Sequence, residues 1–166
     1  MEFKAFLIDP FVLQYFDGTL QLTGEPPIRE VQMTRNIRDI YNVLTPPDRR
    51  KVTTFEACMI DGTYDGDVAY VDEEGLMRGD ATHFVRIKGF VNPFAGRAIV
   101  MGTDAEGDSI APRTTLSALW ERVELSMGNA SVKLKDVPVG APMRPAHVSL
   151  EVGLVAERWG REMAVW

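Results

Sequence analysis

Residues 60–108 decide the fold of this chain, and they read IDGTYDGDVAYVDEEGLMRGDATHFVRIKGFVNPFAGRAIVMGTDAEGD. Short runs rich in β-branched and aromatic residues alternate there with glycine-bearing turns, most of which are acidic. Asp and Gly supply the backbone conformations that tight turns need, and the runs between them have the length of strands. This segment therefore predicts a meander of antiparallel strands whose turn tips carry negative charge.

The sequence before this segment predicts a strand, a hairpin and one good helix. The apolar run Phe3–Ile8 is typical of a buried strand, and Asp17-Gly18 is a two-residue hairpin signal. Apolar residues recur at helical spacing over Met33–Leu44, with Thr34 as the expected N-cap and Pro46-Pro47 as the stop.

Further strands are expected at residues 51–60 and 82–90, and the apolar run 97–101 is typical of a central strand covered on both faces. A short helix is expected to begin after Thr114 or Thr115. These elements predict an α+β fold: a mainly antiparallel sheet with the good helix and the short helix packed on a face.

The domain organisation follows from the same patterns. Residues 1–125 are expected to form the α+β core domain. Residues 126–166 are expected to form a C-terminal β extension that packs on the core or on a second subunit, with a regular strand at Val148–Leu154.

Composition points to a globular protein in a reducing compartment. With 166 residues, 45% apolar and 25% charged, the chain has the size and composition of one domain. No run of 18 apolar residues predicts a membrane span, and the apolar stretch before Asp9 is too short for a signal peptide. A single cysteine, Cys58, cannot form an internal disulfide. We therefore expect a cytoplasmic location.

The net charge of −6 is concentrated in the middle of the chain. Residues 61–125 hold 12 acidic and 6 basic side chains, whereas residues 1–60 and 126–166 are nearly balanced. A negative field repels nucleic-acid phosphates and attracts basic protein surfaces. Direct nucleic-acid binding is therefore not expected, although Arg49-Arg50-Lys51 is a local basic exception. Either docking or simple solubility explains this acidity.

The turn that begins at Asp61 resembles a calcium loop in the spacing of its oxygen-bearing residues. Asp61, Asp65, Asp67 and Asp72 match ligand positions of that template. The template needs a helix on each side, however, and the flanks here have strand patterns. A solvated hairpin turn explains the same residues, so no metal site is predicted.

No catalytic constellation stands out in the sequence. The nucleophile-elbow, phosphate-loop and dinucleotide-binding motifs are absent, and no cofactor is expected. The carboxylates of the acidic turns are expected at exposed tips, where desolvation does not raise a pKa. His83 shares a strand face with Val85 and Ile87, which is typical of a buried, hydrogen-bonded histidine, and Cys58 has the pattern of a structural cysteine.

Parts of the chain resemble small uncharacterised proteins encoded by bacteriophages, plasmids and the bacteria that carry them. The resemblance covers roughly residues 1–9 and 33–125. It rests on four stretches: KAFLIDP at 4–10, the helix at 37–44, YVDEEGL at 70–76 and NPFAGRAIVMGTD at 92–104. The resemblance implies an accessory protein of a mobile element in the bacterial cytoplasm, and it assigns no catalytic residue.

The leading hypothesis is a non-enzymatic accessory protein that docks an acidic surface on a basic host protein, such as a defence or nucleic-acid-processing complex. The residues expected on that surface are Asp61, Asp65, Asp67, Asp72, Glu73, Glu74, Asp104, Glu106 and Asp108.

Two alternatives remain open. One is a small enzyme or ligand-binding domain with a site at the sheet edge near His83, Asp72 and Arg97. The other is a structural homo-oligomer whose subunits meet through the C-terminal strand and tail, with Trp159 and Trp166 as contact residues.

Overall fold

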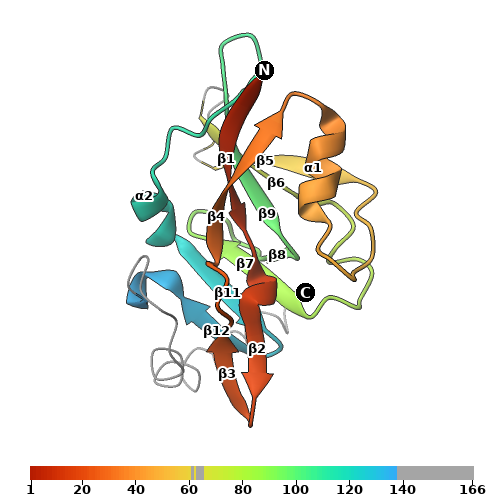
Figure 1. The fold of residues 1–166 in the computed structure, drawn as a ribbon, viewed down its shortest axis with the longest axis vertical. Helices are drawn as coiled ribbons and strands as arrows, with labels where there is room; N and C mark the ends of the chain where they lie inside the picture. Colours follow the sequence, from red (N-terminus) through yellow and green to blue (C-terminus); the bar gives the residue numbers. More distant parts are fainter. Residues whose placement is uncertain (61, 63–65, 138–166) are drawn as a thin grey trace.

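The computed structural model describes residues 1–60, 62 and 66–137, whose strands form three antiparallel sheets (Figure 1). The described elements are, in chain order, β1 (Glu2–Ile8), the 3-10 turn η1 (Pro10–Val12), β2 (Leu13–Phe16), β3 (Thr19–Leu22), β4 (Ile28–Thr34), α1 (Ile37–Leu44), β5 (Phe55–Met59), β6 (Asp67–Asp72), β7 (His83–Ile87), β8 (Phe94–Ala95), β9 (Ala98–Thr103), β10 (Ser109–Ile110), α2 (Leu116–Trp120), β11 (Val123–Met127), β12 (Ala130–Lys133) and the 3-10 turn η2 (Leu134–Asp136).

The largest described sheet has the strand order β4-β1-β9-β6-β5, with β10 added to β9. Its central strand is β9, as the apolar run 97–101 predicts, and Ile99 lies opposite Leu7 on one side and Tyr70 on the other. The second sheet has the order β12-β11-β7-β8, and β2 pairs with β3 in a separate hairpin.

Two apolar cores lie on opposite faces of the largest sheet. Side chains of β1 alternate between them, because successive residues of a strand point to opposite faces. Leu7 packs with Ile40 and Leu44 of α1, whereas Ile8 packs with the second sheet, the β2–β3 hairpin and α2. The two helices therefore cover opposite faces, and the second sheet closes the larger core (Figure 1).

The predicted α+β class with mainly antiparallel sheet is confirmed. The hairpin at Asp17-Gly18 is also confirmed, since both residues adopt positive φ, 49° and 76°. The strands of residues 60–108 do not follow one another in a single meander, however. β6 and β9 belong to the largest sheet, whereas β7 and β8 pair with each other in the second.

The predicted beginning of the long helix is wrong by one turn. Met33 and Thr34 belong to β4, where Met33 lies opposite Phe3 and is fully buried. The cap of α1 is Asn36, whose side chain accepts from the Arg38 N–H. Thr34 instead donates its N–H and hydroxyl to the carboxylate of Asp39. The apolar residues that were spaced like one helix belong instead first to β4 and, after it, to α1.

The predicted domain boundary between residues 125 and 126 falls inside β11, and Val132, Leu134 and Val137 belong to the larger core. Residues 138–166 lie outside the described residues, so the strand at Val148–Leu154 and the contacts of Trp159 and Trp166 stay predictions. No helix in the described part of the chain is long and apolar enough to cross a membrane.

Candidate functional site

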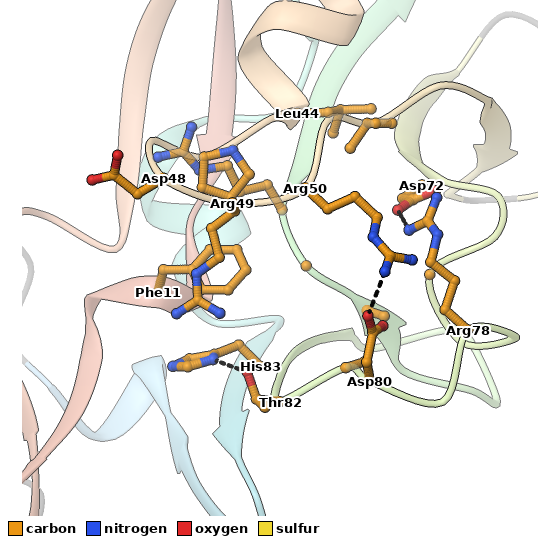
Figure 2. A pocket seen from close by; sticks show the side chains of 17 residues that line it. Phe11, Leu44, Asp48, Arg49, Arg50, Asp72, Arg78, Asp80, Thr82 and His83 are labelled. Carbon is orange, nitrogen blue, oxygen red and sulfur yellow. Dashed lines mark hydrogen bonds and ion pairs between the residues drawn. The ribbon is translucent and has the colours of Figure 1, made fainter.

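A cavity of about 290 Å³ opens where four connections meet at one end of the largest sheet (Figure 2). They are η1, the loop 45–54 after α1, the loop 73–82 between β6 and β7, and the turn between β8 and β9. Loops held at strand ends are common places for binding sites, because a rigid scaffold positions their side chains.

The floor of the cavity is closely packed backbone. Gly96 has a φ of +79° and donates its N–H to the His83 carbonyl at 2.9 Å. Gly75 approaches the same turn so closely that an added Cβ would lie 2.9 Å from the Cβ of Ala95. Glycine at position 75 is therefore needed for the loop 73–82 to pack on β8.

The loop 45–54 is fixed at its base by Thr45. The Thr45 hydroxyl donates to the Tyr41 carbonyl at 2.8 Å and accepts the Val52 N–H at 3.0 Å. Pro46-Pro47 cannot continue the helix, so the chain turns and passes back over the cavity. Arg49 and Arg50 are thus placed at its mouth.

On one wall Arg78 forms a bidentate ion pair with Asp72. Nη1 and Nη2 of Arg78 lie 2.6 Å and 3.3 Å from the two carboxylate oxygens, and both side chains are largely buried. The hydrogen bonds that Arg78 donates to Asp72, together with the negative charge of Asp72, raise the pKa of Arg78 further above its ordinary value. The charge of Arg78 is therefore fixed and largely compensated.

The positive charge of Arg97 is compensated less completely than that of Arg78. Its Nη2 donates to Asp9 at 2.9 Å and its Nη1 to the Val43 carbonyl at 3.1 Å. Asp9 also accepts from Arg29 at 2.8 Å, so one carboxylate is shared by two guanidinium groups. The Nε of Arg97 is buried and has no hydrogen-bond partner. This wall therefore retains both positive charge and an unused donor.

The opposite wall is a stack of three side chains. The Arg49 guanidinium lies 4.3 Å from the centre of the Phe11 ring, and the Phe11 ring lies 4.7 Å from the His83 ring. His83 Nδ1 lies 2.8 Å from the Thr82 hydroxyl, and Nε2 lies 3.1 Å from the Leu13 carbonyl. Nε2 must be the donor toward a carbonyl, which leaves Nδ1 to accept from Thr82 in the neutral ring.

Burial is the largest influence on His83, and it lowers the pKa of the ring below 6.5; the charge of Arg49 lowers it further. His83 is thus neutral at pH 7, and hydrogen bonds occupy both of its nitrogens. This confirms the expected buried, hydrogen-bonded histidine. It also makes His83 a wall of the cavity rather than a base ready to take a proton.

The rim carries an exposed ion pair between Arg50 and Asp80, whose closest atoms are 3.3 Å apart. These residues come from the two loops that face each other across the opening (Figure 2). An ion pair this exposed contributes at most about 1 kcal/mol and exchanges readily. Asp80 therefore holds Arg50 only weakly.

Among the described residues, four arginines and three aspartates line the cavity: Arg49, Arg50, Arg78, Arg97, Asp48, Asp72 and Asp80. Arg49 makes no ion pair with any carboxylate in the described part of the chain. The site can therefore offer a guanidinium fork to an incoming anion without breaking a buried ion pair.

Two carboxylates that were predicted on an exposed acidic surface, Asp67 and Asp72, are used inside the fold. Asp67 is buried and accepts the Arg113 and Thr114 N–H groups at 2.7 Å and 2.8 Å. Asp72 is also largely buried in its pair with Arg78. The prediction of exposure is wrong for these two residues, because a turn residue beside a second segment can accept that segment's backbone hydrogen bonds.

The other predicted acidic residues are distributed differently. Asp104 caps its own turn by accepting from the Glu106 and Asp108 N–H groups, and Arg35 lies within ion-pair distance of both aspartates. Glu73, Glu106 and Asp108 are exposed, and Glu74 is half-buried beside Arg78. Asp61 and Asp65, which belong to the calcium-loop comparison, lie outside the described residues.

The structure brings together the three residues of the sheet-edge alternative, because His83, Asp72 and Arg97 all line the cavity. Sequence reasoning missed Phe11, Arg50 and Asp80. The basic run 49–51 directly after Pro46-Pro47 was the available signal, since consecutive arginines on a short loop concentrate donors at one place.

Comparison with protein-family models, curated proteins and solved structures gave no match.

Proposed function

We propose that this protein binds a small anionic molecule in the cavity between the loops 45–54 and 73–82. One observation carries the proposal. In a chain with a net charge of −6, four arginines converge on one cavity within the described residues, and Arg49 has no carboxylate partner there. Concentrated guanidinium groups are typical of sites that recognise carboxylate or phosphate oxygens.

The size of the cavity limits the ligand. A volume of about 290 Å³ is at the lower end of the range for small-molecule sites. A metabolite-sized anion fits this space, whereas a dinucleotide is too large. The ion pairs of Arg78 with Asp72 and of Arg97 with Asp9 keep the walls in place before the ligand arrives, which lowers the entropic cost of binding.

Binding, rather than catalysis, is the activity that these residues support best. Hydrogen bonds hold both His83 nitrogens, and the Thr82 hydroxyl is engaged with His83. Burial and the charge of Glu56 raise the pKa of the Cys58 thiol, and Cys58 is not among the residues that line the cavity. A nucleophile paired with a free base is therefore absent from the described lining.

Isothermal titration calorimetry with inorganic phosphate at low ionic strength tests the proposal. We expect saturable binding that the double variant Arg49→Ala/Arg50→Ala weakens about tenfold, which corresponds to ~1.4 kcal/mol. Arg38→Ala is the matched control, because Arg38 is an exposed arginine on α1 that does not line this cavity. Equal losses in both variants, or no binding by the wild-type chain, would overturn the proposal.

A second candidate is the docking of the acidic turns on a basic protein of a host cell that carries a phage or plasmid. The exposure of Glu73, Glu106 and Asp108 favours it. Such a complex should weaken steeply with salt, because exposed charges are screened within about 10 Å at 0.1 M. Binding that is indifferent both to salt and to Glu73→Lys/Glu106→Lys would eliminate this candidate.

A further inference from the structure

We infer that the anion bound in this cavity carries a flat aromatic ring, which stacks on the open face of the Arg49 guanidinium. This inference rests on the proposed function and adds the chemical class of the ligand. It assigns separate roles to the two arginines at the mouth: Arg49 contacts the ring, and Arg50 contacts the charged group.

The stack already present in the cavity supports the role of Arg49. Its guanidinium lies over the Phe11 ring at 4.3 Å rather than on a carboxylate. Phe11 in turn leans on His83 at 4.7 Å, with 43° between the ring planes. His83 cannot turn freely, because both of its nitrogens are hydrogen-bonded. The stack is therefore anchored at its inner end.

A guanidinium is planar, so only one of its two faces is covered by Phe11. Arg49 is an exposed residue that lines the cavity, so a ligand that enters the cavity can reach its guanidinium. Aromatic rings and arginine planes stack favourably, and the attraction grows when water is removed from between them. A ring seated against Arg49 adds one more flat group to the cluster of His83, Phe11 and Arg49.

The charged end of the same ligand would then lie toward the other side of the cavity. In Figure 2, Arg49 and Phe11 stand on one side of the hollow, and Arg50, Asp80 and Arg78 stand on the other. Arg78 is committed to Asp72, whereas Arg50 is held only by the exposed Asp80. An anion can therefore take Arg50 from Asp80 without exposing a buried charge.

The substitution Arg49→Lys provides a sharp test, because it keeps the positive charge and removes the flat face. Phenyl phosphate and inorganic phosphate are titrated into the full chain by calorimetry, together with benzoate and acetate, which distinguish phosphate from carboxylate as the preferred charge. We expect each aromatic anion to bind about tenfold tighter than its ring-free counterpart. Arg49→Lys should reduce that advantage to about threefold or less. The measured quantity is the ratio of aromatic to ring-free affinity within each protein, so a loss of affinity that is common to both anions cancels.

The outcomes separate this inference from the function on which it rests. Equal binding of aromatic and ring-free anions, or an aromatic advantage that survives Arg49→Lys, would overturn the inference and leave anion binding intact. Failure of all four anions to bind would overturn the proposed function and this inference with it. A similar loss of affinity for all four anions in Arg50→Ala, with the aromatic advantage unchanged, would confirm the separate roles.

Discussion

Asp67 provides the clearest test of how this fold uses its acidic residues. It begins β6, is 6% exposed, and accepts two backbone N–H groups from residues 113 and 114 at 2.7 Å and 2.8 Å. A hydrogen bond to a charged group contributes about 1.5–3 kcal/mol, so Asp67→Ala should lower the free energy of unfolding by roughly 3–6 kcal/mol. Asp67→Asn keeps the size and one acceptor but turns an NH₂ group toward an N–H, so about half that loss is expected.

The assay is urea unfolding followed by circular dichroism, with Glu73→Gln as the control. Both Asp67→Asn and Glu73→Gln remove one negative charge, but Glu73 is exposed and its replacement should change the free energy of unfolding by no more than about 0.5 kcal/mol. If the two amide variants unfold at the same urea concentration, the two backbone hydrogen bonds do not stabilise the fold. Asp67 would then be available to an acidic surface, and the structural reasoning would be refuted.

Three further variants test the cavity. Gly75→Ala should lower the free energy of unfolding, measured in urea, by about 1–3 kcal/mol, because the added Cβ meets that of Ala95. Adding Ala95→Gly to the same chain should restore part of the loss. An unchanged free energy of unfolding in Gly75→Ala would contradict the close packing. His83→Gln should remove a pH dependence of stability. Burial lowers the pKa of His83 in the folded state below its unfolded value of 6.5, so the unfolded chain binds the proton more readily. The free energy of unfolding of the wild type should therefore decrease as the pH falls below 6.5, by up to about 1.4 kcal/mol per pH unit. An identical slope in wild type and variant would contradict this assignment. Asp80→Asn should tighten phosphate binding about threefold in calorimetry, because it releases Arg50 from its ion pair. Weaker binding by this variant would contradict the weak hold of Asp80 on Arg50.

Local patterns predicted the elements better than they predicted the way those elements pair. Asp17-Gly18 defined its hairpin because the turn chemistry and the strand pairing are adjacent in sequence. The separation of β6 and β7 into different sheets depends on contacts between distant segments, such as Val85 with Leu125, and no local pattern encodes those. The beginning of α1 was misplaced for the same reason, since β4 is recognisable only from its pairing with β1.

In the candidate site, too, the sequence indicated some residues and missed those that long-range packing brings in. The sequence analysis named His83, Asp72 and Arg97 together as a sheet-edge site. They meet in the structure because Asp72 ends β6, His83 begins β7 and Arg97 directly precedes β9. Phe11 and Asp80 reach the cavity only through the packing of η1 and the loop 73–82. The acidic turns were harder still, because Asp67 and Glu73 look alike in sequence and only the neighbouring backbone decides which one is buried.

An NMR titration shows at the level of single residues whether the cavity binds anions through Arg49 and Arg50. The Nε–H resonances of the arginine side chains are followed while phenyl phosphate is added to the full chain. We expect the Arg49 and Arg50 resonances to shift along one saturable curve, while the resonance of exposed Arg38 on α1 does not shift. Equal and unsaturated shifts at all three arginines, or no shift at Arg49 and Arg50, would contradict it.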